Sequence, residues 1–204
     1  MSRTLLSDLS LTDTETLNGA WLQWGMDLQI AVLEEELSEL GEEITLAHID
    51  GLYWSDGTLE ELADVLVCLS QVEMVLRHHP ISDLRGPCPP WEIVEDRAAS
   101  AHLADAPPDL LLLLYTLRLK KEISKTRRYN GGSVVWCIPV LTAIGELIHC
   151  LSVVVADLCI HRHNKGVYWD RVLRIRTSKL FRLRDRLEEA REAERVAAED
   201  REVV

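Results

Sequence analysis

The chain has 204 residues, of which 47% are hydrophobic and 5% aromatic, and it carries a formal net charge of -12. This length allows one sizeable core and is short for two independent domains, so we expect a single domain over 1–204. The acidic balance argues against a general nucleic-acid binder, which needs a basic face. Residues that favour helices dominate and strand periodicity is absent, which predicts an all-α fold, a helical bundle.

The first long predicted helix covers about 16–47, after a short N-terminal segment, and carries acidic residues beside an apolar stripe. The stripe has helical spacing and consists of Leu33, Leu37, Leu40 and Ile44. Glu36 and Glu39 are three residues apart, so they are neighbours on the helix surface. They flank the stripe instead of lying opposite to it.

A second helix, predicted over about 59–78, repeats this arrangement after a turn-rich link at 50–58. Its apolar stripe consists of Leu62, Leu66 and Leu69. Packing the two stripes together brings four carboxylates to the seam: Glu36, Glu39, Glu61 and Asp64. Their repulsion would raise their pKa values unless a cation joined them, and oxygen-only ligation suits Mg²⁺ or Mn²⁺. The alternative is a pair of amphipathic helices with solvated acidic faces.

The next region, 79–108, holds six of the seven prolines and is predicted to be a linker with a short helix at 91–103. A helix follows over about 109–128 and ends before Asn130, which precedes two glycines.

The stretch 134–160 is apolar and long enough to span a bilayer, but it contains Glu146, His149 and Asp157, which are costly at the bilayer centre. We therefore expect the buried central helix of a bundle, from near Pro139 to about 164, with a membrane span as the alternative.

A last helix is predicted to begin near Tyr168. Its charged tail after 187 is predicted to be solvated or frayed, or to bind a partner helix.

A faint internal repeat relates the two halves of the chain. Residues 33–40 align with 119–126, and 59–66 align with 144–151, so that Glu36 and Glu61 match Glu122 and Glu146. The second copy, over 109–163, is degenerate and its first helix is basic. A duplicated helix pair predicts a core with one acidic and one basic half. This asymmetry suits a nucleoside triphosphate, with a metal ion on the acidic half and the phosphate oxygens on the basic half. Coincidence between amphipathic helices is the alternative.

The acidic motifs also resemble those of a known family. E-E-x-x-E at 35–39 and E-x-x-D at 61–64, inside a wider match over 29–76, resemble the all-α nucleoside triphosphate pyrophosphohydrolases, the superfamily of the MazG proteins and the dimeric dUTPases. The resemblance implies hydrolysis of a (d)NTP to (d)NMP and pyrophosphate, with Mg²⁺ or Mn²⁺ as cofactor. The implied metal ligands are Glu36, Glu39, Glu61 and Asp64.

The same resemblance suggests roles for other residues. Glu35 would orient or deprotonate the attacking water, and a shared face of the basic helix would bind the phosphates through Lys121, Lys125 and Arg128. The dUTPase branch has asparagine where this chain has Lys125.

Base and sugar contacts are weakly marked. Gln29 lies where the family places base-reading residues, Asn130 could contact sugar or phosphate or cap its helix, and Trp54 is a candidate for stacking on the base. The other aromatic candidates are Trp21, Trp24, Tyr53 and Trp136.

Two other functions stay open. One is a nucleotide-binding or scaffold bundle without turnover. The other is a di-iron site built on Glu146-x-x-His149 with three further glutamates, Glu36, Glu61 and Glu122.

We expect a homodimer or higher homo-oligomer that acts on a small-molecule nucleotide, with no nucleic-acid or membrane partner. The five cysteines show no paired spacing and the N-terminus has no signal-peptide pattern, which predicts a cytoplasmic protein, in the host cytoplasm if it is phage-encoded.

Overall fold

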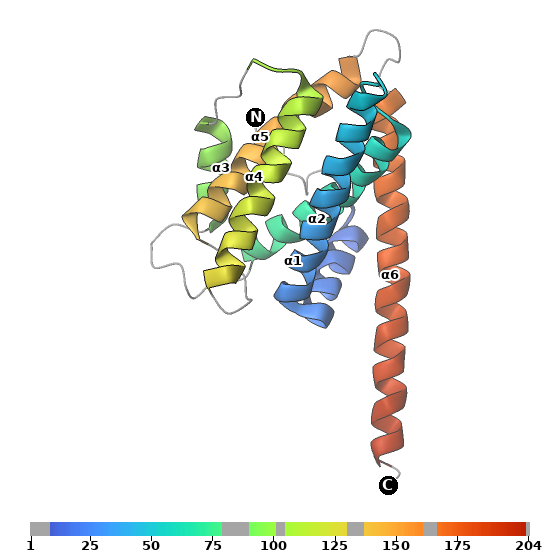
Figure 1. Cartoon of the computed structure of the whole chain (residues 1–204). Coiled ribbons are helices and arrows are strands. Elements are labelled where there is room, and N and C mark those ends of the chain that lie inside the picture. The colour runs from blue at the N-terminus through green and yellow to red at the C-terminus, as the bar shows by residue number, and fades with distance from the viewer. Residues whose placement is uncertain (1–8, 79–89, 101–104, 130–136, 161–166, 203–204) are drawn as a thin grey trace.

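The computed structural model describes residues 9–78, 90–100, 105–129, 137–160 and 167–202, which form six helices without a strand among them (Figure 1). The helices are α1 (Leu11–Ile49), α2 (Asp56–His78), α3 (Pro90–Ser100), α4 (Pro108–Tyr129), α5 (Ile138–Ile160) and α6 (Val167–Glu202). The predicted all-α bundle is confirmed.

Helix α1 begins at Leu11, so the prediction that it starts near Thr16 was wrong. The reason is a capping box: the Asp13 N–H donates to Ser10 Oγ at 3.2 Å, and the Ser10 N–H donates to the Asp13 carboxylate at 3.1 Å. The helix is broken at Gly25, whose φ of 76° lies in the left-handed region that glycine adopts without strain. This break separates the segment that ends in Trp24 from the segment that carries the acidic motif.

Two helix pairs share one core. The predicted stripes of α1 and α2 pack together, and the seven leucine and isoleucine side chains that form them are at most 2% exposed. Helices α4 and α5 form a second pair, which joins the same core through packing of α4 on α1. Helix α6 packs against α2 and α1 on another side and extends beyond the bundle (Figure 1).

Helix α5 is long and apolar enough to cross a membrane by length and composition, and half of its apolar window is buried within the protein. It packs against α3, α4 and α6. The short helix predicted inside the 79–108 linker is present as α3, and it contributes Trp91 and Val94 to the core. The tail of α6 after Leu187 is helical and mostly exposed, so the predicted fraying was wrong, and its use as a surface for a partner helix stays a prediction.

Gly145 of α5 lies against the backbone of α3. A Cβ atom at this position would lie 2.6 Å from the carbonyl oxygen of Val94. We therefore expect Gly145→Ala to lower the free energy of unfolding by about 1–3 kcal/mol, because the two helices must separate. Chemical denaturation measures this change.

Gly41→Ala is the matched control for this substitution. Its Cβ would meet only Leu113 Cδ1, at an ordinary 3.5 Å, so the better helix propensity of alanine should stabilise the protein by up to about 1 kcal/mol. Equal effects at the two glycines would contradict the tight packing of α3 on α5.

Candidate functional site

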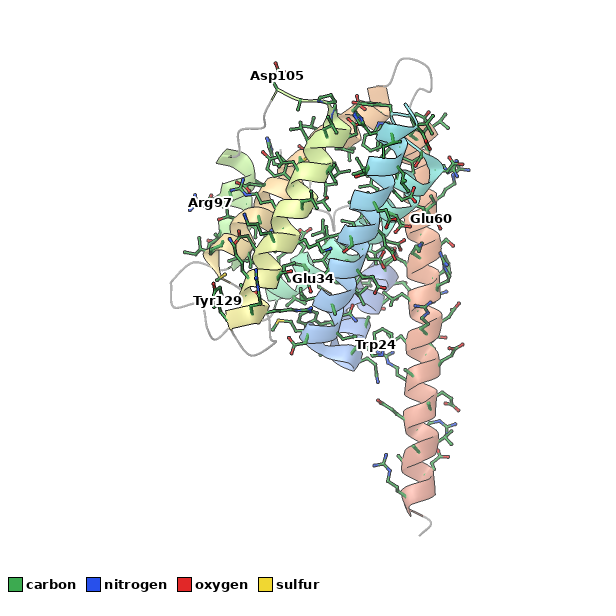
Figure 2. The ribbon with its side chains drawn as sticks, in the orientation of Figure 1. Trp24, Glu34, Glu60, Arg97, Asp105 and Tyr129 are labelled. Atoms are coloured by element: carbon green, nitrogen blue, oxygen red, sulfur yellow. The ribbon has the colours of Figure 1, made fainter. Side chains whose placement is uncertain are left out.

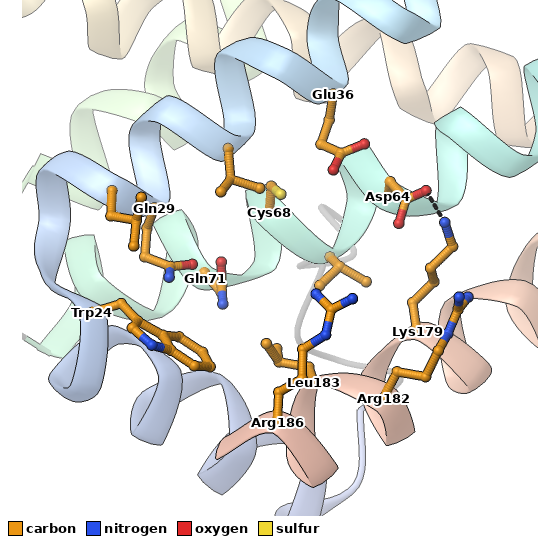
Figure 3. A pocket seen from close by; sticks show the side chains of 13 residues that line it. Trp24, Gln29, Glu36, Asp64, Cys68, Gln71, Lys179, Arg182, Leu183 and Arg186 are labelled. Atoms are coloured by element: carbon orange, nitrogen blue, oxygen red, sulfur yellow. Dashed lines mark hydrogen bonds and ion pairs between the residues drawn. The ribbon is translucent and has the colours of Figure 1, made fainter. Parts of the chain in front are cut away.

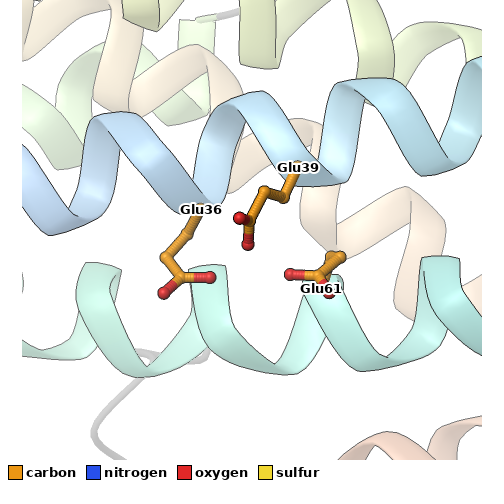
Figure 4. Close-up of side chains that lie close together, drawn as sticks. All are labelled: Glu36, Glu39 and Glu61. Carbon is orange, nitrogen blue, oxygen red and sulfur yellow. The ribbon is translucent and has the colours of Figure 1, made fainter.

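Three of the four predicted metal ligands lie together at the α1–α2 seam (Figure 4). Glu36 and Glu39 of α1 and Glu61 of α2 each offer a carboxylate oxygen, and these oxygens lie within 4.8 Å of one another. We call these three residues the carboxylate trio. The helical spacing of Glu36 and Glu39 and the packing of the two stripes account for this convergence, as the sequence predicts.

Asp64, the fourth predicted ligand, is one turn further along α2 and is held by a cation. Its carboxylate forms an ion pair with the ammonium of Lys179 on α6 (Figure 3). The same ammonium lies 3.9 Å from Glu60. The sequence alone did not suggest this partner for Asp64.

The trio is electrostatically strained. Burial, followed by the negative charges of Asp64, Glu39 and Glu61, raises the pKa of Glu36 to about 7, although Lys179 acts in the opposite direction. Burial, then Asp64 and Glu39, likewise raises the pKa of Glu61 to about 7. The buried Oε2 of Glu61 accepts no hydrogen bond from the part of the chain that the structure describes. The positive charge of Lys179 is not enough to offset burial and repulsion at Glu36 and Glu61.

A cavity of about 380 Å³ opens beside the trio, between α1, α2 and α6 (Figure 3). Glu36 and Asp64 line it on the acidic side. The remaining polar lining falls into two groups, one of amides with an indole and one of cations.

The first group combines Gln29 and Trp24 of α1 with Gln71 of α2. The two glutamines are 8% and 3% exposed, yet neither side-chain amide makes a hydrogen bond within the described ranges. The polar atoms of these two amides are open to the cavity, where each amide can both donate and accept a hydrogen bond. Trp24 ends the α1 segment before the Gly25 break, lies on the side of α1 that faces α6 (Figure 2), and points toward these amides (Figure 3). This end of the cavity suits a flat ring with polar edges.

The second group comes from α6 and consists of Lys179, Arg182 and Arg186. Their spacing of i, i+3 and i+7 places them on one face of the helix. Lys179 pairs with Asp64, whereas no acidic partner of Arg182 or Arg186 lies within ion-pair distance among the residues described. The sequence does contain a run of basic residues over 171–186 that includes this group, but the resemblance pointed to the basic helix α4 instead.

The predicted phosphate-binding residues of α4 do not line this cavity. Lys125 forms an ion pair with Glu122 at 2.6 Å, and Lys121 and Arg128 are exposed. Glu122 and Glu146 match Glu36 and Glu61 in the repeat. Each has a cation beside it, because Lys125 pairs with Glu122 and Arg118 lies 2.9 Å from Glu146. The two glutamates of the second helix pair are therefore neutralised by ion pairs, whereas Glu36 and Glu61 of the first pair are not.

Other predicted residues fall outside the cavity. Trp54 is buried in the core, and its indole N–H donates to Asp157 at 3.2 Å. Glu35 is exposed and belongs neither to the trio nor to the cavity lining. Asn130 and Trp136 lie outside the residues that the structure describes. Of the residues predicted to contact base or sugar, Gln29 and the alternative aromatic candidate Trp24 line the cavity.

The residues that the structure describes do not assemble the alternative di-iron site. Among them, the carboxylate trio is the one group of three metal-ligating side chains that lie close together, and it includes neither Glu146 nor His149.

Comparison with protein-family models, with curated proteins and with solved structures finds no match to this chain.

Proposed function

We propose that the protein is a metal-dependent nucleoside triphosphate pyrophosphohydrolase, which converts a (d)NTP to (d)NMP and pyrophosphate. The observation that carries this proposal is the carboxylate trio at the side of a cavity that has an amide-and-indole end and a cationic end. A nucleotide has the same sequence of chemical groups, from a flat base to a polyphosphate. The resemblance of the two acidic motifs to the pyrophosphohydrolases supports the same conclusion.

The residues of the site fit Mg²⁺ or Mn²⁺. The donors are carboxylate oxygens only, and one of them, Glu61 Oε2, is buried without a hydrogen-bond partner in the described part of the chain. Glu36, Glu39 and Glu61 would hold the ion, with Asp64 beside them. When bound, the ion would polarise a phosphoryl oxygen and lower the pKa of a water molecule.

The chain's own side chains orient the substrate in this proposal. Trp24 stacks on the base, and Gln29 and Gln71 hydrogen-bond its edge, which satisfies their amides. Water forms a bond to the α-phosphorus while the bond from that phosphorus to the bridging oxygen breaks, and pyrophosphate leaves. The water proton needs a base, and the assignment of that role to the exposed Glu35 stays a prediction.

A nucleotide-binding module without turnover is the second candidate. The ion pair between Lys179 and Asp64 favours it, because that pair occupies one of the four acids expected to serve a metal. Both functions use the same cavity and differ in whether pyrophosphate is released.

A pyrophosphate-release screen over the common NTPs and dNTPs with Mg²⁺ tests the proposal. We expect release from one or a few substrates with the wild type and none with Glu36→Gln. Glu122→Gln is the matched control, because it changes an ion-paired glutamate outside the cavity and should keep full activity. If nucleotides raise the Tm of the wild type without any release, the binding module is supported instead, and release that survives Glu36→Gln contradicts the role of the trio.

A further inference from the structure

We infer that α6 supplies the phosphate-binding wall of the site, with Arg182 and Arg186 bound to the β- and γ-phosphates of the nucleotide and Lys179 beside them. This inference rests on the proposed function, because it assigns the polyphosphate end of the same ligand. It places the recognition of phosphate on the C-terminal helix and not on α4.

The three cations share one face of α6 and line the cavity, as Figure 3 shows. An arginine guanidinium presents a planar fork of donors that matches phosphate oxygens, and charge-assisted hydrogen bonds of this kind are among the stronger ones. Because Arg182 and Arg186 make no ion pair with any residue that the structure describes, their charges are available to an anionic ligand.

Helix α6 is fixed where it carries these cations. Arg176, which is 5% exposed, donates to Ser70 Oγ of α2 at 2.8 Å, one turn before Lys179. Leu180 and Leu187 are buried on either side of the arginines. Buried contacts therefore hold the backbone under the cations, which reduces the entropy lost when they bind an anion.

The two ends of the cavity define one orientation for the ligand. Trp24, Gln29 and Gln71 gather at the end remote from Lys179, and Glu36 lies across the cavity from Arg186, near the middle of the view (Figure 3). A base on the indole therefore directs the phosphates past Glu36 toward α6. The α-phosphate then lies nearest to the trio, where cleavage into monophosphate and pyrophosphate requires it.

Neither α4 nor the other arginines of α6 offer an equivalent surface. Lys121, Lys125 and Arg128 lie outside the cavity lining. Arg174 and Arg184 of α6 also lie outside it, and the Arg184 guanidinium sits over the Phe181 ring at 4.4 Å. These residues provide controls that remove the same number of charges from the same protein.

Calorimetric titration with inorganic tripolyphosphate in Mg²⁺ tests the inference without any need for turnover. We expect the double variant Arg182→Gln/Arg186→Gln to bind tripolyphosphate at least about tenfold more weakly than the wild type. The salt dependence of binding should fall as well, because fewer charges pair with the anion. Arg174→Gln/Arg184→Gln, with an equal loss of charge, should stay within about twofold of the wild type.

Equal weakening in the two double variants would overturn the inference, as would loss of affinity in Lys121→Gln/Arg128→Gln or a wild type that does not bind tripolyphosphate. Thermal melts of each variant check that it is folded. If the protein releases pyrophosphate, Arg182→Gln/Arg186→Gln should raise KM more than it lowers kcat.

Two outcomes separate this inference from the proposed function. If Arg182→Gln/Arg186→Gln releases pyrophosphate like the wild type, phosphate binding by α6 is overturned and the hydrolase proposal stands. If this variant selectively loses tripolyphosphate binding but the wild type releases no pyrophosphate, phosphate binding by α6 is supported and the hydrolase proposal is overturned.

Discussion

Glu36→Gln is expected to make the metal-free protein more stable at pH 8 and, under the proposed function, to remove the activity. The pKa of Glu36 is about 7 in the folded protein against an ordinary 4.5, so the folded state binds more protons than the unfolded state between these values. The free energy of unfolding therefore falls as the pH rises through this window. The full destabilisation by the Glu36 charge is reached above pH 7. Glutamine keeps the shape of the side chain and removes the charge.

Thermal melts in EDTA at pH 5 and pH 8 measure this effect. Since the carboxylates are partly exposed and screened by solvent, we expect a gain in Tm of about 2–4 °C at pH 8, which corresponds to roughly 1 kcal/mol in a chain of this size. The gain should be smaller at pH 5. Mg²⁺ should raise the Tm of the wild type at pH 8 and leave that of the variant nearly unchanged.

If the proposed function holds, the same substitution should lower kcat/KM by about a thousandfold, or about 4 kcal/mol, because Glu36 would be a ligand of the ion that supplies the chemistry. Glu35→Gln, which changes the exposed neighbour, is the control for the melts and should leave the Tm nearly unchanged. A Tm at pH 8 that falls in Glu36→Gln would contradict the account of repulsion within the trio.

Trp24→Ala should weaken nucleotide binding, with KM raised by about 5- to 150-fold. This range corresponds to the roughly 1–3 kcal/mol that stacking of a base on an aromatic ring contributes. The affinity for tripolyphosphate should not change, because that anion has no base to stack. Trp24→Phe keeps a ring in place and should recover most of the lost affinity.

Trp54→Phe is the control for Trp24→Ala, because Trp54 lies in the core whereas Trp24 lines the cavity. It removes the N–H that donates to Asp157, so it should lower stability while KM stays the same. A Trp24→Ala protein with the KM of the wild type would show that the base lies elsewhere.

The sequence was most informative where contacts are local or between neighbouring helices. The apolar stripes of α1 and α2 determine how the two helices pack, and the acids beside the stripes then meet at the seam. The resemblance to the pyrophosphohydrolases, and not the apolar pattern, pointed to Gln29, which lies two turns before Glu36 on the same helix and lines the cavity. The early start of α1 was missed because its signal is the pair Ser10 and Asp13, which precedes the apolar periodicity.

The cationic wall could not be located in this way. Spacing along α6 shows that Lys179, Arg182 and Arg186 share a face, but it does not show which helices that face meets. Trp54 illustrates the same limit, because its partner Asp157 belongs to α5, far along the chain. Such contacts depend on how distant helices dock, and periodicity describes only one helix at a time.

The ion pair between Lys179 and Asp64 has a thermodynamic consequence for the proposed enzyme. A metal ion ligated by Asp64 would compete with the Lys179 ammonium for the negative charge of this carboxylate, so ligation by all four acids would weaken the ion pair. The ammonium lines the cavity beside the two arginines, where a triphosphate would offer it a second partner. Metal and nucleotide would then bind cooperatively, and linkage requires that each tightens the other by the same factor.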